Sequence, residues 1–152
     1  MSVKYDIVSN FLNYESITDN KILLNICNDS VYGVTDSNEF YSRYYKLEDS
    51  FYNNKQKYFF GNNYYHNIFS YHIVCNMICV DWPKSFYNIN PFKYNHFTKC
   101  IKKLNSYILN NNIKLILTPI FGKEILQGDW SKIMKIIIDN IESKTKIIIF
   151  KS

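Results

Sequence analysis

Four short apolar segments recur along this chain, each separated from the next by polar or amphipathic sequence. They are KILLNIC (21–27), YHIVCNMIC (71–79), IKLILT (113–118) and TKIIIFK (145–151). Near-continuous apolar runs of this length are typical of strands that are buried on both faces of a sheet. A further strand is predicted at 3–8, where apolar and polar residues partly alternate. This pattern restricts the chain to folds built around a central sheet.

Amphipathic segments with helical spacing lie between the apolar runs. Residues 37–52 place aromatic and aliphatic residues on one helical face. The clearest helix is predicted to have Pro91 in its first turn and Asn90 as its cap. Its apolar stripe consists of Phe97, Ile101, Leu104 and Ile108. A last helix is predicted at 129–143, with Asp129 as the N-cap and isoleucines facing inward.

Strands that alternate with helices in one domain predict an α/β fold. Helices on both faces of the sheet give a three-layer α/β/α architecture with a central mixed sheet. At 152 residues, of which 47% are hydrophobic, the chain is long enough to bury one core, and its sequence shows no linker or internal repeat. We therefore expect a single domain over 1–152.

Charge and cysteine usage restrict the partners. The net charge of +5 has two interpretations, a charge that favours solubility or a cleft for an anionic ligand. No run of like charge is longer than Lys102-Lys103, so a nucleic-acid partner is not expected. Cys27, Cys75 and Cys79 lie in apolar segments and are expected to pack as small buried hydrophobes. The protein is expected to be reduced and cytoplasmic. It is also expected to be a monomer. Neither a signal peptide nor a membrane span is predicted.

The histidines and tyrosines favour structural roles. His66, His72 and His96 have no acidic partner nearby in the sequence, and His96, on the predicted long helix, is expected to face solvent. The tyrosine-rich segments YSRYY (41–45) and NNYYHNIFSY (62–71) have rings that could stack on bases. Because no basic residue other than Arg43 interleaves them, packing on helix and sheet faces is the favoured interpretation.

Two predicted loops leave the carboxyl ends of strands and lead into helices. One covers residues 28–37 and the other residues 119–129. Open α/β sheets bind ligands at the carboxyl ends of their strands, and helix starts bind phosphate through free backbone N–H groups. These loops therefore predict a nucleotide site. The first loop holds a single glycine, Gly33, although phosphate loops are normally glycine-rich, so an ordinary turn is the alternative.

Five motifs follow one another along the chain. SNFL (9–12) stands at the place of an early Gly-Asp-aliphatic signature, with Asn10 where the aspartate would be, and Asn28-Asp29 matches an Asn-Asp pair after the next strand. The later motifs are Asn76-Met77-Ile78, a helix led by Tyr94, and a closing loop. In that loop Pro119, Gly122 and Gly128-Asp129-Trp130 match a P-x-I-G…G-D-W pattern, with Phe121 in place of its isoleucine. Together they resemble a macro domain, the ADP-ribose-binding module, over almost the whole chain. The closing loop is the most specific of these matches.

The resemblance implies a site for ADP-ribose or a related nucleotide, without a metal or other cofactor. The chain is most similar to phage- and virus-type members related to ADP-ribose-1″-phosphate phosphatases, which implies a viral protein with hydrolase activity. Asn28 would hold the distal ribose and Asp29 would orient a water or a loop, so both are the implied catalytic residues. The implied ligand-binding residues are Asn10, Gly33, Phe121, Gly122, Lys123 and Glu124.

Several of these residues have a second interpretation. Asn10 fits an adenine contact or a turn, and Phe121 fits a wall for the ribose or a core residue. Gly122 allows a close approach of the backbone to phosphate or simply forms a turn. Glu124 fits a general base for a water or a loosened phosphate loop, and Lys123 would offset its charge. Asn28-Asp29 also fits an Asx turn.

The chain departs from the family pattern in its phosphate loops. Val31 and Asp36 occupy positions where glycines are expected, and Glu124 places a carboxylate beside the distal phosphate. A branch of the family cleaves esters with a lysine and an aspartate, whose positions here correspond to Val80 and Leu126, so a covalent route is not expected. The alternative to an ADP-ribose site is therefore a degenerate macro domain that acts as a non-catalytic binding or interaction module.

Overall fold

The computed structural model describes residues 5–8, 21–27, 58–69, 72–81, 92–119, 129–142 and 144–150. Within these ranges the strands are β1 (Tyr5–Val8), β2 (Lys21–Cys27), β3 (Asn63–Phe69), β4 (His72–Ile78), β5 (Leu115–Pro119) and β6 (Lys146–Phe150). The helices are α3 (Tyr94–Asn111) and α4 (Trp130–Asn140). All of the predicted strands are present, and the helix predicted at 37–52 lies outside the described residues.

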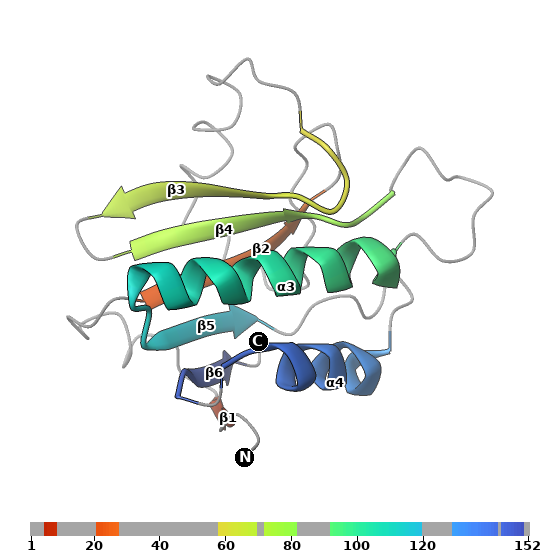
Figure 1. Ribbon diagram of the computed structural model, residues 1–152. Coiled ribbons are helices and arrows are strands. Elements are labelled where there is room, and N and C mark those ends of the chain that lie inside the picture. The colour runs from red at the N-terminus through yellow and green to blue at the C-terminus, as the bar shows by residue number, and fades with distance from the viewer. Residues whose placement is uncertain are drawn as a thin grey trace.

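The strands form one mixed sheet in the order β1-β6-β5-β2-β4-β3 (Figure 1). All neighbours are parallel except β3, which runs antiparallel to β4 at one edge. The predicted mixed sheet is therefore confirmed. The parallel strands place their carboxyl ends along one edge of the sheet, which is where a ligand site is expected.

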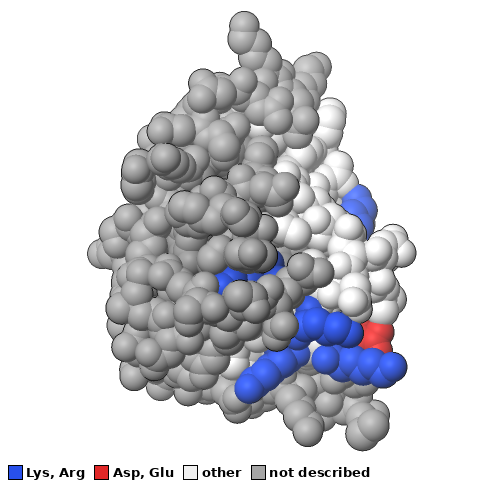
Figure 2. Space-filling model, turned by 90° about the vertical axis from the view of Figure 1, so that its left-hand side faces the viewer, with Lys and Arg blue, Asp and Glu red and all other residues white. Residues whose placement is uncertain are grey.

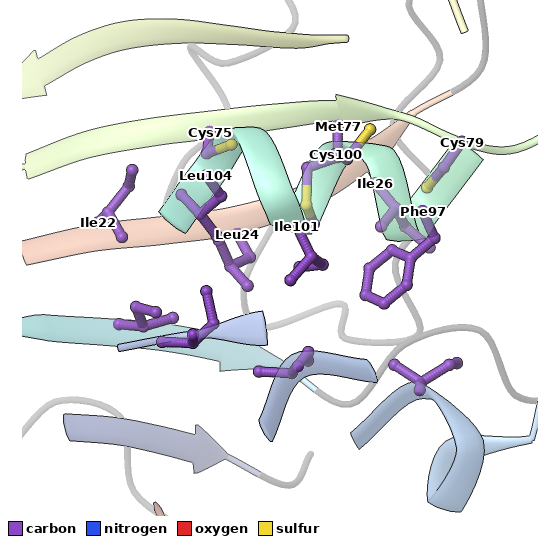
Figure 3. Packing of buried hydrophobic residues seen from close by; sticks show 14 of the residues in the cluster. Ile22, Leu24, Ile26, Cys75, Met77, Cys79, Phe97, Cys100, Ile101 and Leu104 are labelled. Carbon is purple, nitrogen blue, oxygen red and sulfur yellow. The ribbon is translucent and has the colours of Figure 1, made fainter. Parts of the chain in front are cut away.

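Helices α3 and α4 cover one face of this sheet (Figure 1). Ile22, Leu24 and Ile26 alternate along β2 and pack with the buried stripe of α3 in one core cluster (Figure 3). The predicted stripe of Phe97, Ile101, Leu104 and Ile108 is buried as expected. On the opposite face, Leu23 and Val74 are also fully buried. The predicted third layer falls on residues outside the described ranges.

The start of α3 differs from the prediction. The helix begins at Tyr94, with Lys93 in an extended conformation as N-cap and no side-chain cap, so neither Asn90 nor Pro91 has the predicted role. The reason is tertiary, since Phe92 forms an antiparallel bridge with Val80 and keeps the chain extended up to the helix. The end of α3 is set by a local residue, since Asn112 adopts the left-handed conformation that asparagine tolerates.

Two further expectations are settled by burial. All four cysteines are free and buried, which confirms that Cys27, Cys75 and Cys79 pack as small hydrophobes. The expectation that His96 faces solvent is wrong, because its ring is half-buried and stacks on Phe60 at 5.0 Å between centroids. Neither described helix is long and apolar enough to cross a membrane.

Candidate functional site

The carboxyl ends of β2 and β5 lie side by side in the sheet. The two strands are parallel neighbours, with Ile22 opposite Ile116 and Leu23 opposite Leu117. Strand β2 ends at Cys27 and β5 ends at Pro119. The segments that begin at residues 28 and 120 therefore leave adjacent strands at the same edge. This confirms the arrangement on which the predicted site depends.

The predicted site residues themselves lie outside the described residues. They are Asn10, Asn28, Asp29, Gly33, Phe121, Gly122, Lys123 and Glu124. The structure instead gives the points from which they start. Asn28 follows the last residue of β2 directly, and the residues from Phe121 to Glu124 follow β5 within five positions. Asn10 follows β1, which is separated from β2 by β6 and β5.

The segment between β5 and α4 is anchored at both ends. At its start, Pro119 is paired with Phe150 of β6. At its end, the carboxylate of Asp129 accepts a 2.9 Å hydrogen bond from the backbone N–H of Ser131 and caps α4, as predicted. The backbone N–H of Asp129 also donates to the hydroxyl of Tyr94 at 2.8 Å. Residues 120–128 therefore connect two fixed points.

The exit of β4 is tied to the end of β2. The carbonyl of Cys27 accepts hydrogen bonds from the backbone N–H groups of Cys79 at 3.1 Å and Val80 at 3.2 Å. The carbonyl of Cys79 in turn accepts from the N–H of Lys93 at 3.0 Å. Val80 is fully buried, and its aliphatic side chain supplies no nucleophile. The strand end that precedes Asn28 is thus held by backbone bonds to its neighbour.

A buried pair of asparagines lies just below this strand end. Asn25 and Asn76 are directly opposite each other on β2 and β4, and the Nδ2 of Asn25 donates to the Oδ1 of Asn76 at 2.9 Å. The thiol of Cys27 lies 3.5 Å from the same Nδ2. Asn25 is 2% exposed and Asn76 is fully buried.

The pairing of Asn25 with Asn76 was not predicted from the sequence. The sequence shows one asparagine in each of two largely apolar segments, Asn25 in 21–27 and Asn76 in 71–79. It does not show that these two segments form neighbouring strands. The Oδ1 of Asn25 and the Nδ2 of Asn76 have no hydrogen-bond partner. One buried acceptor and one buried donor of this pair therefore remain unsatisfied, and Asn25 lies three residues before Asn28 in the chain.

The buried thiols are not candidates for nucleophilic chemistry. Burial raises the pKa of Cys79 and of Cys75 well above the usual value, and the neighbouring Cys100 adds to both shifts. Burial also raises the pKa of Cys100 to about 12. Because the thiolate is the reactive form, these thiols stay protonated and inert near neutral pH.

Comparison with solved structures identifies the fold. A protein of unknown function from Bacteroides thetaiotaomicron is 16% identical to this chain, with a TM-score of 0.81 over 99% of each chain. The macrodomain of Mycobacterium tuberculosis DarG is 14% identical, with a TM-score of 0.71 over 95% of this chain and 97% of the other. The Oceanobacillus iheyensis macrodomain with ADP is 11% identical, with a TM-score of 0.59 over 99% and 87%.

Comparisons based on sequence give no match for this chain. No protein-family model matches the chain, and no curated protein matches it. At the identities above, the structural likeness concerns the fold and not the ligand. The chain therefore has the fold of a macro domain.

Proposed function

We propose that this chain binds ADP-ribose, or a close derivative, at the carboxyl ends of β2 and β5. The observation that carries the proposal is that these two strands are parallel neighbours whose ends lead directly into the two predicted phosphate loops. An α/β sheet binds nucleotides at such an edge. Support also comes from the Oceanobacillus iheyensis macrodomain, a protein of the same fold that is described with ADP.

The proposed contacts follow the order of the strands. Asn28, directly after β2, holds the distal ribose, and Asp29 orients a water beside it. Gly33 and Gly122 allow backbone N–H groups to approach the diphosphate. Asn10 contacts the adenine from the end of β1.

The residues around Gly122 tune the phosphate end of the site. Phe121 forms a wall for the ribose, and Lys123 offsets the charge of Glu124. This offset is needed because a carboxylate in a partly desolvated cleft repels phosphate. Neutralising Glu124 is therefore expected to strengthen the binding of ADP-ribose.

Hydrolysis of ADP-ribose-1″-phosphate is the proposed reaction at this site. A water held by Asp29 attacks phosphorus, the bond from phosphorus to the 1″ oxygen breaks, and the proton of the water passes to the leaving oxygen. The products are ADP-ribose and inorganic phosphate. Positioning the water and holding the phosphate supply the rate enhancement in this scheme.

A second candidate function is favoured by the composition of the first loop. Val31 and Asp36 stand where glycines would let the backbone approach a phosphate, and Glu124 adds a like charge. With these residues the chain would keep the fold and act as a non-catalytic interaction module. The two candidates differ in one measurable property, which is affinity for ADP-ribose.

Thermal unfolding in the presence of ADP-ribose tests the proposal. A ligand present at one hundred times its dissociation constant stabilises the folded state by about 2.7 kcal/mol. We expect a stabilising shift with ADP-ribose, confirmed by calorimetry. Release of inorganic phosphate from ADP-ribose-1″-phosphate then tests the catalytic step.

Two asparagine variants assign the binding to the proposed site. Asn28→Ala should weaken the binding of ADP-ribose, whereas Asn95→Ala, on the exposed side of α3, should not. Absence of any shift at millimolar ADP-ribose would refute binding and leave the interaction module. Equal affinity of the wild type and Asn28→Ala would remove Asn28 from the site.

A further inference from the structure

One side of α3 carries two lysines between two rings. His96, Lys99, Lys103, Tyr107 and Asn110 recur at spacings of three or four residues and so follow one another along one side of the helix. We call this set the α3 stripe. Its lysines are exposed, and His96 and Tyr107 are half-buried. The stripe borders β3, the strand at the edge of the described sheet.

The rings of the stripe are held in place by rings from the neighbouring segment. Tyr107 stacks on Tyr65 with 3.8 Å between centroids and 8° between planes. His96 stacks on Phe60 at 5.0 Å and 25°. The hydroxyl of Tyr65 accepts a 3.3 Å hydrogen bond from Asn63, so its position is fixed. Tyr107 lies eleven positions after His96, which corresponds to about 16 Å along the helix axis.

A cavity of about 350 Å³ lies between the stripe and β3. It is lined by Lys103, three tyrosines and three asparagines. The amide Nδ2 of Asn63 donates to the carbonyl of Cys100 at 2.7 Å, while its Oδ1 is buried and has no hydrogen-bond partner. The ammonium group of Lys103 contacts the Oδ1 of Asn62 at the rim. The cavity therefore combines flat apolar surfaces with amide and ammonium groups.

The charge along α3 is positive, and among the described residues the carboxylate that acts on His96 is that of Asp81. The helix contains no aspartate or glutamate. Among the described residues, Lys99 and Lys102 form no ion pair with a carboxylate. The ion pair found in this part of the chain joins Lys135 and Asp139 on α4. Burial lowers the pKa of His96, and Lys99 and Lys93 lower it further by repulsion. A positive field of this kind attracts anionic partners.

We propose that the α3 stripe and the adjoining strand β3 bind single-stranded nucleic acid. Such surfaces combine cations for the phosphates with aromatic rings on which bases stack. The stripe has two lysines, Lys99 and Lys103, between two oriented rings. A duplex buries its base faces and cannot use the rings. A single strand is therefore the form of nucleic acid that matches both features.

This inference differs from the expectation drawn from the sequence. No basic residue interleaves Tyr64 and Tyr65 in the chain, so a nucleic-acid role was not predicted for them. The lysines are contributed by α3, more than thirty residues later, and only the packing of β3 beside α3 brings them to the tyrosines.

A second group of lysines provides a matched comparison. Lysine side chains also gather on the face at the amino ends of the parallel strands (Figure 2). There Lys114 and Lys144 line a cavity of about 220 Å³ together with Glu142 and without any aromatic side chain. The described residues that line this cavity therefore include cations but no ring on which a base can stack.

Fluorescence anisotropy with labelled oligothymidylate of about fifteen nucleotides, within the range bound by single-strand proteins, tests the proposal on the full chain. We expect the wild type to bind the single strand more tightly than a duplex of the same length. The double variant Lys99→Gln/Lys103→Gln should weaken binding at least fivefold and lower the slope of log affinity against log salt by about 1.4. Lys114→Gln/Lys144→Gln, which removes the same charge, should change affinity less than twofold.

The stacking component is tested at Tyr107. Tyr107→Leu should weaken binding about tenfold, and Tyr107→Phe, which keeps the ring, should bind like the wild type. Thermal unfolding of each variant checks the fold, and if Tyr107→Leu does not fold, the two lysine variants decide the question. The stabilising shift with ADP-ribose should be the same in Lys99→Gln/Lys103→Gln as in the wild type, which separates this site from the one at the strand ends.

Three results would overturn the proposal. The first is no binding of the single strand by the wild type at low salt. The second is an equal loss in the two lysine double variants, which would indicate unspecific attraction by net charge. The third is competition by inorganic polyphosphate as strong as that by the oligonucleotide, with Tyr107→Leu unaffected, which would indicate a general polyanion surface.

Discussion

The Nδ2 of Asn25 donates a 2.9 Å hydrogen bond to the Oδ1 of Asn76 across two paired parallel strands inside the sheet. Neither residue is accessible to solvent beyond 2%. The bond joins β2 to β4 close to the ends from which the candidate site is built. Removing one of the two asparagines leaves the other amide buried without its partner. This unpaired amide costs more free energy than the hydrogen bond itself contributes to stability.

Replacing both asparagines should therefore destabilise the fold less than the sum of the two single replacements. We expect Asn76→Leu to lower the free energy of unfolding by about 1–3 kcal/mol, since Asn25 then loses its acceptor. The double variant Asn25→Leu/Asn76→Leu should lose clearly less than the sum of the single losses. Urea unfolding of the four proteins in this cycle measures the coupling, and strict additivity would contradict an energetic link.

The cap of α4 should be worth a measurable part of the stability. Asp129→Ala removes the acceptor for the N–H of Ser131 and should lower the free energy of unfolding by about 1 kcal/mol. Asp129→Ser keeps an oxygen at the cap and should retain most of the stability. Chemical denaturation compares the three proteins. A loss in Asp129→Ser as large as in Asp129→Ala would show that capping is not the cause.

Gly61 should resist substitution because of its backbone conformation. Its φ is +81°, and an added Cβ would lie 3.2 Å from the Cδ of Lys99. Gly61→Ala should destabilise the fold by about 1–2 kcal/mol, because a left-handed conformation is unfavourable for residues with a Cβ. Gly61→Asn should cost less, since asparagine tolerates this region. A higher melting temperature for Gly61→Ala than for Gly61→Asn would contradict this explanation.

His96 should make the stability depend on pH in mildly acidic solution. Burial, with the nearby Lys99 and Lys93, lowers its pKa in the folded state below the usual 6.5. As the pH falls, His96 is therefore protonated in the unfolded chain before it is protonated in the folded one. The contribution of His96 to stability is intact above about pH 6.5 and is lost as the pH falls towards the folded pKa. The stability difference between the wild type and His96→Gln, followed from pH 8 to 5, should shrink with falling pH. A constant difference would contradict the assignment.

Sequence alone predicted those elements whose signals are local. The limits of β2 agree with the run KILLNIC, and Asp129 caps α4 as expected, because hydrophobic pattern and cap chemistry act over a few residues. The start of α3 was missed, because it is set by the bridge between Phe92 and Val80. The burial of His96 was missed for the same reason, as its partner Phe60 comes from another segment.

The candidate site was predictable only in its framework. Two loops after buried strands indicated an edge of the sheet, and the neighbouring positions of β2 and β5 confirm it. The amide pair of Asn25 and Asn76 was not predictable, since a strand sequence does not state which strand lies beside it. The assignments of Asn28, Asp29 and the residues after Pro119 remain predictions to be tested by the binding experiments above.

The pairing of β1 with β6 has a practical consequence for those experiments. The two strands run in the same direction, with Tyr5 opposite Ile147 and Val8 opposite Phe150. The chain thus enters β1 at the end of the sheet away from the proposed site and leaves β6 at the end that carries it. A fluorophore attached directly after Phe150 would start at that edge, whereas one attached directly before Tyr5 would start at the opposite end of the strands, so labels for the binding experiments belong before Tyr5.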